Sequence, residues 1–118
     1  MSTSDIHVVL QEVGGRLVVP LQDPVYDQMI EVTRERLLNY LHERAVSAVV
    51  LDLSAVEVLD GYDFEKLRQL ADAMALMGAP VILAGIRPGV AAGLVALDVD
   101  DRWVRTALNV SQALARSL

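Results

Sequence analysis

The sequence predicts an α/β fold in which a mixed, mostly parallel sheet of four or five strands carries about four helices. Short apolar runs rich in valine, isoleucine and leucine alternate with longer segments of helical periodicity, an order typical of parallel strands joined by right-handed crossovers. The run at 48–53 is almost wholly apolar, as expected for a strand buried on both faces. The chain has 118 residues and no linker or repeat, so we expect a single domain over residues 1–118.

The first two strands are expected to form an antiparallel hairpin. Residues 6–10 and 16–19 are β-rich, and the pair Gly14 and Gly15 lies between them. Residues 11–13 make this connection a loose one. Pro20 ends the second strand because proline cannot donate a hydrogen bond to the ladder.

The first helix is expected to begin at Asp23 and to end near Arg44. Asp23 is a suitable N-cap, and Pro24 fits the first helical position. Residues at helical spacing form its apolar face, namely Val25, Met29, Val32, Leu37 and Leu41. The charged residues on the other side are interpreted as a solvated face.

A second helix is expected to follow the run at 48–53, with Asp60 and Gly61 preceding it. Its apolar stripe consists of Phe64, Leu67, Leu70 or Ala71, Met74 and Met77. Gly78 is a natural C-terminal cap for this helix, and Pro80 follows it.

The last third of the chain repeats the alternation. Residues 81–84 form another buried strand, and Pro88 can begin a third helix. The apolar face of that helix consists of Val90, Leu94 and Leu97. Residues 102–106 alternate like an edge strand, and Asn109 can cap a final helix.

Composition argues against most catalytic chemistry. There is no cysteine, which excludes a disulfide framework and a thiol nucleophile, and only His7 and His42 are available as histidines. The formal net charge of -6 and the 4% of aromatic residues make nucleic acid an unsuitable partner. No signal peptide and no apolar run long enough to cross a membrane is visible. We therefore expect a cytoplasmic protein without a cofactor, which acts by binding.

Ligands of open α/β sheets usually bind beyond the carboxyl ends of the strands. Asp52, Asp60, Asp63 and Arg87 are the charged residues expected to converge there. There is no glycine-rich phosphate motif and no nucleophile beside a base. Asp60 and Asp63 could hold a divalent cation, but capping the second helix is the simpler interpretation. Arg87 could bind an anion, although we favour its pairing with one of these aspartates.

Two segments resemble the STAS domain family. They are VVLDLSAVEVLDG at 49–61 and LMGAPVILAGIRP at 76–88, and the likeness extends from about residue 6 to residue 118. It is a likeness to stressosome scaffold proteins of the RsbS type and to the C-terminal domains of RsbR-type co-antagonists. The resemblance implies a domain without catalytic activity that signals by partner switching. Its implied partners are RsbR-like STAS homologues, an RsbT-like serine/threonine kinase or an anti-sigma factor.

The sequence departs from the family at the residues that carry the switch. In the family, a serine or threonine follows the aspartate at the start of the second helix, and here Gly61 stands at that position. A second phosphothreonine of RsbR-type domains corresponds to Gly93. Glycine has no hydroxyl and cannot accept phosphate, so both positions keep the unmodified surface. Gly61 also fits a tight turn or a close helix approach, and both interpretations stay open.

Two more residues complete the expected partner surface. Ser54 is the nearest remaining hydroxyl and is better suited to capping its turn than to accepting phosphate. Tyr62 can add an apolar, hydrogen-bonding anchor. We expect a partner-switching scaffold that binds through the loop and helix beginning at Asp60, with homo-oligomerisation left open. The alternatives are an anti-sigma-factor antagonist that binds an anti-sigma kinase, and a small-molecule or nucleotide sensor.

Overall fold

The computed structural model describes residues 6–96 and 105–116. Within this part of the chain, five strands form one sheet in the order β1-β2-β3-β4-β5, and β1 alone runs antiparallel to its neighbour. The strands are β1 (Gln11–Val13), β2 (Arg16–Pro20), β3 (Ala48–Asp52), β4 (Val81–Ala84) and β5 (Arg105–Ala107). The mixed, mostly parallel sheet expected from the sequence is confirmed.

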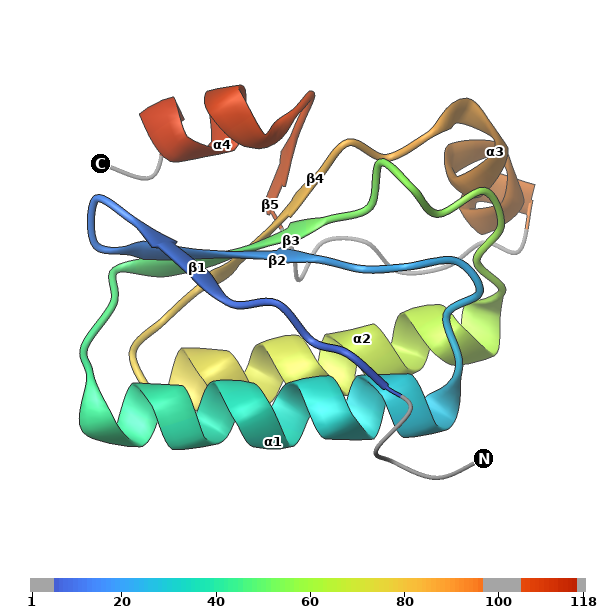
Figure 1. The fold of residues 1–118 in the computed structure, drawn as a ribbon. Helices are drawn as coiled ribbons and strands as arrows, with labels where there is room; N and C mark the ends of the chain where they lie inside the picture. Colours follow the sequence, from blue (N-terminus) through green and yellow to red (C-terminus); the bar gives the residue numbers. More distant parts are fainter. Residues whose placement is uncertain (1–5, 97–104, 117–118) are drawn as a thin grey trace.

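Four helices connect or follow the strands in the described residues. They are α1 (Asp27–Glu43), α2 (Gly61–Leu76), α3 (Pro88–Ala96) and α4 (Val110–Arg116). Figure 1 shows α1 and α2 side by side against one face of the sheet, here called the inner face, and α4 against the opposite, outer face. In the same view α3 lies at the end of the sheet where the parallel strands finish.

The core follows from the alternation of side chains along the strands. Leu17, Val49 and Leu83 point to the inner face and pack with both long helices, and each is 0% exposed. The outer face is built from smaller side chains. A second cluster there contains Val18, Ala48, Val50, Ile82, Ala84, Ala107 and Ala113.

The expected position of the first strand is wrong. Residues 6–10 form no strand, and β1 consists of the three residues expected to be a loose connection. Gly14 and Gly15 have φ of 56° and 81°, so they make a two-residue turn that pairs Val13 directly with Arg16. The tight turn therefore places the strand immediately beside the glycines.

The expected start of the first helix is also wrong. The helix begins at Asp27, and Tyr26 occupies the N-cap position without a side-chain cap. The Asp23 carboxylate instead accepts a hydrogen bond from Glu57 N at 3.4 Å. Residues 21–25 cross from the sheet to the helix layer, because Leu21 and Val25 are both buried in the core.

Most of the remaining elements agree with expectation. Asp60 caps α2, Pro88 begins α3, and Asn109 accepts a hydrogen bond from Gln112 N at the start of α4. Met77 was expected on the buried stripe, but α2 ends at Leu76 and Met77 is 42% exposed. On α1, Val32 is only half-buried, and Ile30 and Thr33 take its place in the core.

Some expectations fall on residues outside the described part of the chain. Leu97 of the expected third helix and residues 102–104 of the expected edge strand belong there. Among the described residues, no helix combines the length and the apolar character that a membrane span requires.

Candidate functional site

The carboxyl end of the sheet gathers segments that are far apart in the sequence. The loop between β3 and α2 receives the Asp23 contact at Glu57 from one side and α3 from the other. A Cβ atom on Gly89 would lie 3.1 Å from Glu57 O, and one on Gly93 would lie 3.9 Å from Leu59 O. Gly89 therefore allows α3 to lie close against this loop, whereas at Gly93 the distance is that of an ordinary contact.

The first turn of α2 holds two carboxylates together. Asp60 Oδ1 accepts a hydrogen bond from Asp63 N at 2.8 Å, as expected for an N-cap. Burial and the negative charge of Asp60 raise the pKa of Asp63. Among the described residues, no group of three His, Cys, Asp or Glu side chains is placed to hold a metal ion. The arrangement suits a helix cap.

Tyr62 stands on the surface beside Gly61 and is tied to α1. Its side chain is 59% exposed, and its hydroxyl donates a hydrogen bond to Asp27 Oδ2 at 2.7 Å. The ammonium of Lys66 lies 5.7 Å from the ring centroid. The hydrogen bond to Asp27 raises the pKa of Tyr62, because phenolate could not donate it. Sequence reasoning missed Asp27, because it lies 35 positions from Tyr62 and no local signal connects the two residues.

Gly61 and Gly93, which the resemblance led us to expect at the family's phosphoacceptor positions, both belong to elements at this end of the sheet. Gly61 is the first residue of α2 and is half-buried. It is not among the described glycines with positive φ, so a left-handed turn is not what requires glycine there. At Gly93 a Cβ would make only an ordinary contact, 3.9 Å from its nearest neighbour. Sterically, a side chain fits at Gly93.

Arg87 and Asp52 do not take the expected partners. Arg87 Nη1 lies 3.8 Å from Glu57 Oε1, in a pair that is exposed on both sides, and the expected pairing with an aspartate is wrong. Asp52 Oδ1 accepts a hydrogen bond from Ser54 N at 3.0 Å, so Asp52, and not the Ser54 hydroxyl, closes this turn. In the described residues no hydrogen bond joins Asp52 to Asp60 or Asp63.

A cavity of about 440 Å³ opens at the carboxyl ends of β3 to β5. It is lined by Asp52, Ser54, Gly85, Leu108, Asn109, Val110 and Ser111. Arg87 is not among these described lining residues, and none of them is a lysine or arginine. Its described lining therefore offers no guanidinium or ammonium group to a phosphate.

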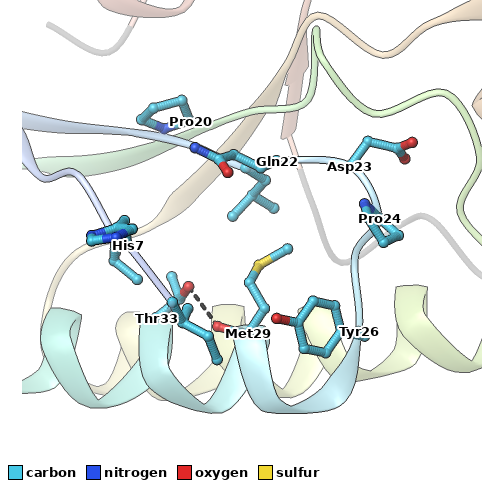
Figure 2. Close-up of a pocket in the computed structure, with 11 residues that line it drawn as sticks. His7, Pro20, Gln22, Asp23, Pro24, Tyr26, Met29 and Thr33 are labelled. Atoms are coloured by element: carbon cyan, nitrogen blue, oxygen red, sulfur yellow. Dashed lines mark hydrogen bonds between the residues drawn. The ribbon is translucent and has the colours of Figure 1, made fainter. Parts of the chain in front are cut away.

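A second cavity, of about 240 Å³, lies between the N-terminal segment and the start of α1. In Figure 2, Met29 points into it from α1, with His7 on one side and Tyr26 on the other. The Thr33 hydroxyl beside it already donates a hydrogen bond to Met29 O at 2.8 Å. Its described lining includes no lysine or arginine, so it offers no cation for a nucleotide phosphate either.

Comparison with known proteins agrees with this fold. A family model described as STAS domain matches residues 7–113. The RsbT co-antagonist proteins RsbRA and RsbRB of Bacillus subtilis are 29% and 30% identical over 94% and 82% of this chain. The chain spans less than half the length of these curated relatives, 43% and 35%.

Solved structures give the same picture. An RsbS variant from Moorella thermoacetica is 32% identical with a TM-score of 0.78, over 93% of each chain. A chain from a structure of the stressosome, described as a signal integration and transduction hub, is 31% identical with a TM-score of 0.78, over 92% of this chain and 95% of that one. The unphosphorylated anti-sigma factor antagonist SpoIIAA shares the fold, with a TM-score of 0.71 at 15% identity over 93% of this chain and 95% of that one.

Proposed function

Since this chain belongs to the STAS domain family, we propose that it is a non-enzymatic, partner-switching scaffold of a stressosome-like signalling module. The observation that carries the proposal is the match to RsbS, which extends over 93% of both chains at 32% identity. The match to a stressosome chain and the relatives named RsbT co-antagonists support the same role. The proposed kinase partner uses ATP, so we propose this role for the cytoplasm, and it needs no cofactor.

The proposed binding site is the surface around the start of α2, here called the switch surface. It consists of Ser54, Asp60, Gly61, Tyr62, Asp63, Arg87 and Gly93. STAS homologues and an RsbT-like kinase are its proposed partners, and oligomerisation with homologues belongs to the same role. Phosphate would add about -1.5 to -2 charges to such a surface. Because Gly61 and Gly93 cannot accept phosphate, binding here is constitutive and is controlled elsewhere in the complex.

Intact mass after incubation with an RsbT-type kinase and ATP tests this proposal. The wild-type chain is expected to stay unmodified, whereas Gly61→Ser supplies a hydroxyl after Asp60 and is expected to gain one phosphate. Gly61→Ala is the matched control, because it adds a side chain without a hydroxyl. A stoichiometric phosphate on the wild-type chain would contradict constitutive binding.

Binding measurements separate this proposal from its alternatives. The scaffold is expected to bind an RsbR-type STAS domain, whereas an anti-sigma-factor antagonist would bind an anti-sigma kinase and not the STAS domain. The likeness to SpoIIAA concerns the fold alone and does not favour the antagonist. A thermal shift with nucleotides, but with no protein partner, would instead indicate a ligand sensor.

A further inference from the structure

We propose that the partner docks on the switch surface with a basic segment that carries an apolar side chain, and that Asp27 positions Tyr62 as the anchor for it. This inference rests on the proposed function, because it describes the partner of the same surface. Three observations carry it: the charge around Tyr62, the exposed apolar side chains there, and the hydrogen bond that fixes Tyr62.

The charge at this end of the molecule is negative. Five carboxylates lie on the connections and helix starts that meet there, namely Asp23, Asp27, Glu57, Asp60 and Asp63. The described cations that contact the same residues are Arg87, which lies 3.8 Å from Glu57, and Lys66, which lies over the Tyr62 ring. Carboxylates therefore outnumber cations, and a basic partner segment is attracted to this surface.

Exposed apolar side chains accompany the carboxylates. Val58 is 73% exposed in the loop before α2, Tyr62 is 59% exposed in its first turn, and Val95 is 80% exposed on α3. Gly89 allows α3 to lie close against the same loop. Large apolar side chains with a polar rim are typical of protein interfaces. The partner segment is therefore expected to offer an apolar side chain as well as positive charge.

Tyr62 is the residue of this surface that is best fixed before a partner arrives. The 2.7 Å hydrogen bond to Asp27 Oδ2 joins α2 to α1, so the ring loses little further freedom on binding. The neighbouring Gly61 has no side chain that could shield the ring from a partner. Exposed tyrosines of this kind are enriched among the residues that dominate binding energy. Asp27 acts through Tyr62 and is a positioning residue.

The test measures binding of this chain to two probes, Bacillus subtilis RsbT and the STAS domain of RsbRA. We expect the Kd to rise several-fold when salt increases from about 0.05 to 0.3 M, because screening weakens surface charge pairs. Tyr62→Ala is expected to weaken binding about tenfold or more. Tyr62→Phe is expected to weaken it by a smaller factor, since it removes the hydrogen bond alone. Asp27→Ala is expected to weaken it more than Tyr62→Phe, since it removes the hydrogen bond and one of the five carboxylates.

Two controls isolate the hydrogen bond. In the Tyr62→Phe background, Asp27→Ala is expected to lose the part of its effect that comes from the hydrogen bond and to keep the part that comes from its charge, which a double-mutant cycle separates. Glu35→Ala removes an exposed carboxylate from the same helix and is expected to leave the Kd unchanged. A pH titration of the Tyr62 ring signals by NMR is expected to show Tyr62 ionising at lower pH in Asp27→Ala, because the hydrogen bond to Asp27 raises its pKa.

The possible outcomes separate the two proposals. If the wild-type chain binds neither probe, the proposed function and this inference both fall. If it binds, but neither salt nor the Tyr62 and Asp27 variants change the Kd, the inference alone is overturned. An unchanged ionisation of Tyr62 in Asp27→Ala would exclude the positioning role.

Discussion

The first turn of α2 uses two neighbouring carboxylates in different ways. Asp60 accepts the hydrogen bond from Asp63 N, which satisfies one of the free N–H groups at the helix start. Asp63 lies in the first turn, where the helix dipole favours negative charge, yet burial and the charge of Asp60 oppose its ionisation. Asp60 therefore stabilises the fold, whereas the charged form of Asp63 lowers its stability.

Removing the cap is expected to destabilise the protein. Asp60→Ala should lower the free energy of unfolding by about 1 kcal/mol, because the Asp63 N–H loses its acceptor. Asp60→Asn keeps an acceptor oxygen and should stay within about 0.5 kcal/mol of the wild-type chain. Urea unfolding measures both. Equal losses in the two variants would show that the charge, and not the cap, stabilises the helix.

Replacing Asp63 is expected to raise the free energy of unfolding, in contrast to replacing Asp60, and the gain is expected to depend on pH. Asp63 binds its proton more tightly in the folded than in the unfolded chain, so its contribution to stability falls as pH rises from the ordinary value of 3.8 through the raised folded pKa. Asp63→Asn removes this fall. Relative to wild type, it should gain up to about 0.5 kcal/mol at pH 7 and little near pH 3.

Denaturant unfolding at the two pH values checks the Asp63 prediction. Asp72→Asn is the matched control, since Asp72 is an exposed aspartate of the same helix. A gain of equal size at both pH values would mean that the ionisation of Asp63 is not its cause.

Two glycines with positive φ allow the effect of backbone conformation to be separated from the effect of crowding. Gly78 has φ of +83° with nothing within 4 Å of an added Cβ, whereas at Gly85, with φ of +72°, the Cβ would lie 3.1 Å from Ser54 Cβ. Gly78→Ala should lower the free energy of unfolding by about 1 kcal/mol, because alanine is strained in this backbone conformation. Gly85→Ala should cost about 2–4 kcal/mol, because crowding is added. Thermal unfolding compares them, and an equal loss would show that Ser54 moves aside.

At the scale of elements, the two faces of the sheet are covered differently. The inner face carries the long helices α1 and α2, with large side chains between the layers. The outer face carries α4, a helix of seven residues, and the cluster there contains four alanines beside Val18, Val50 and Ile82. Ala113 is 0% exposed there and belongs to one cluster with Ala48, Ala84 and Ala107. Small residues at this contact let the short helix lie close to the strands.

Enlarging Ala113 tests this close packing. Ala113→Leu should lower the free energy of unfolding by about 1–3 kcal/mol, since Ala113 is 0% exposed and packs in one cluster with residues of the strands. Ala115→Leu, at an exposed position of the same helix, should change it by no more than about 0.5 kcal/mol. Chemical denaturation of both variants is the measurement. A stable Ala113→Leu chain would mean that the added side chain fills the cavity of about 250 Å³ that Ala113 lines, or that α4 moves away from the sheet.

Element positions were predictable where local signals agree. Asp60, Gly78 and Pro88 mark helix ends by their own chemistry, and the structure places α2 and α3 accordingly. The start of α1 was not predictable. Asp23 and Pro24 have the form of a helix start, but tertiary packing places residues 21–25 between the layers and delays the helix to Asp27.

At the scale of the whole molecule, stability is concentrated in the middle of the sheet. β3 pairs with strands on both sides, and Val49, Val50 and Leu51 are each 0% exposed. β1 and β5 are three residues long, and each pairs with one neighbour in the described structure. Regions with dense burial open only with the whole fold, whereas short edges open locally.

Hydrogen exchange is expected to follow this difference. The amides of Val49 to Leu51 should exchange only through global unfolding, and those of β1 should exchange orders of magnitude faster. Exchange followed by mass spectrometry, with urea at low concentrations, distinguishes the two regimes. Equal protection of β1 and β3 would mean that the hairpin of β1 and β2 opens only when the central strands of the sheet unfold.

Some residues of the candidate site lie close together in the sequence, whereas others meet only in the folded chain. Asp60, Tyr62 and Asp63 were identified from the sequence because they lie within four positions of one helix start. The contacts of Tyr62 with Asp27 and of Glu57 with Asp23 span 35 and 34 positions, so only the folded chain brings these residues together. A single sequence holds no signal for such pairs.

The hairpin turn and the connection between α1 and β3 meet at the end of the sheet opposite the switch surface (Figure 1). Ser47 N donates a hydrogen bond to Gly15 O at 2.8 Å, while the exposed Ser47 hydroxyl is held only at 3.4 Å. Because the chain has no cysteine, Ser47→Cys would create a unique thiol there. A dye or a sensor chip coupled to that thiol leaves the opposite end of the molecule free to meet its partners.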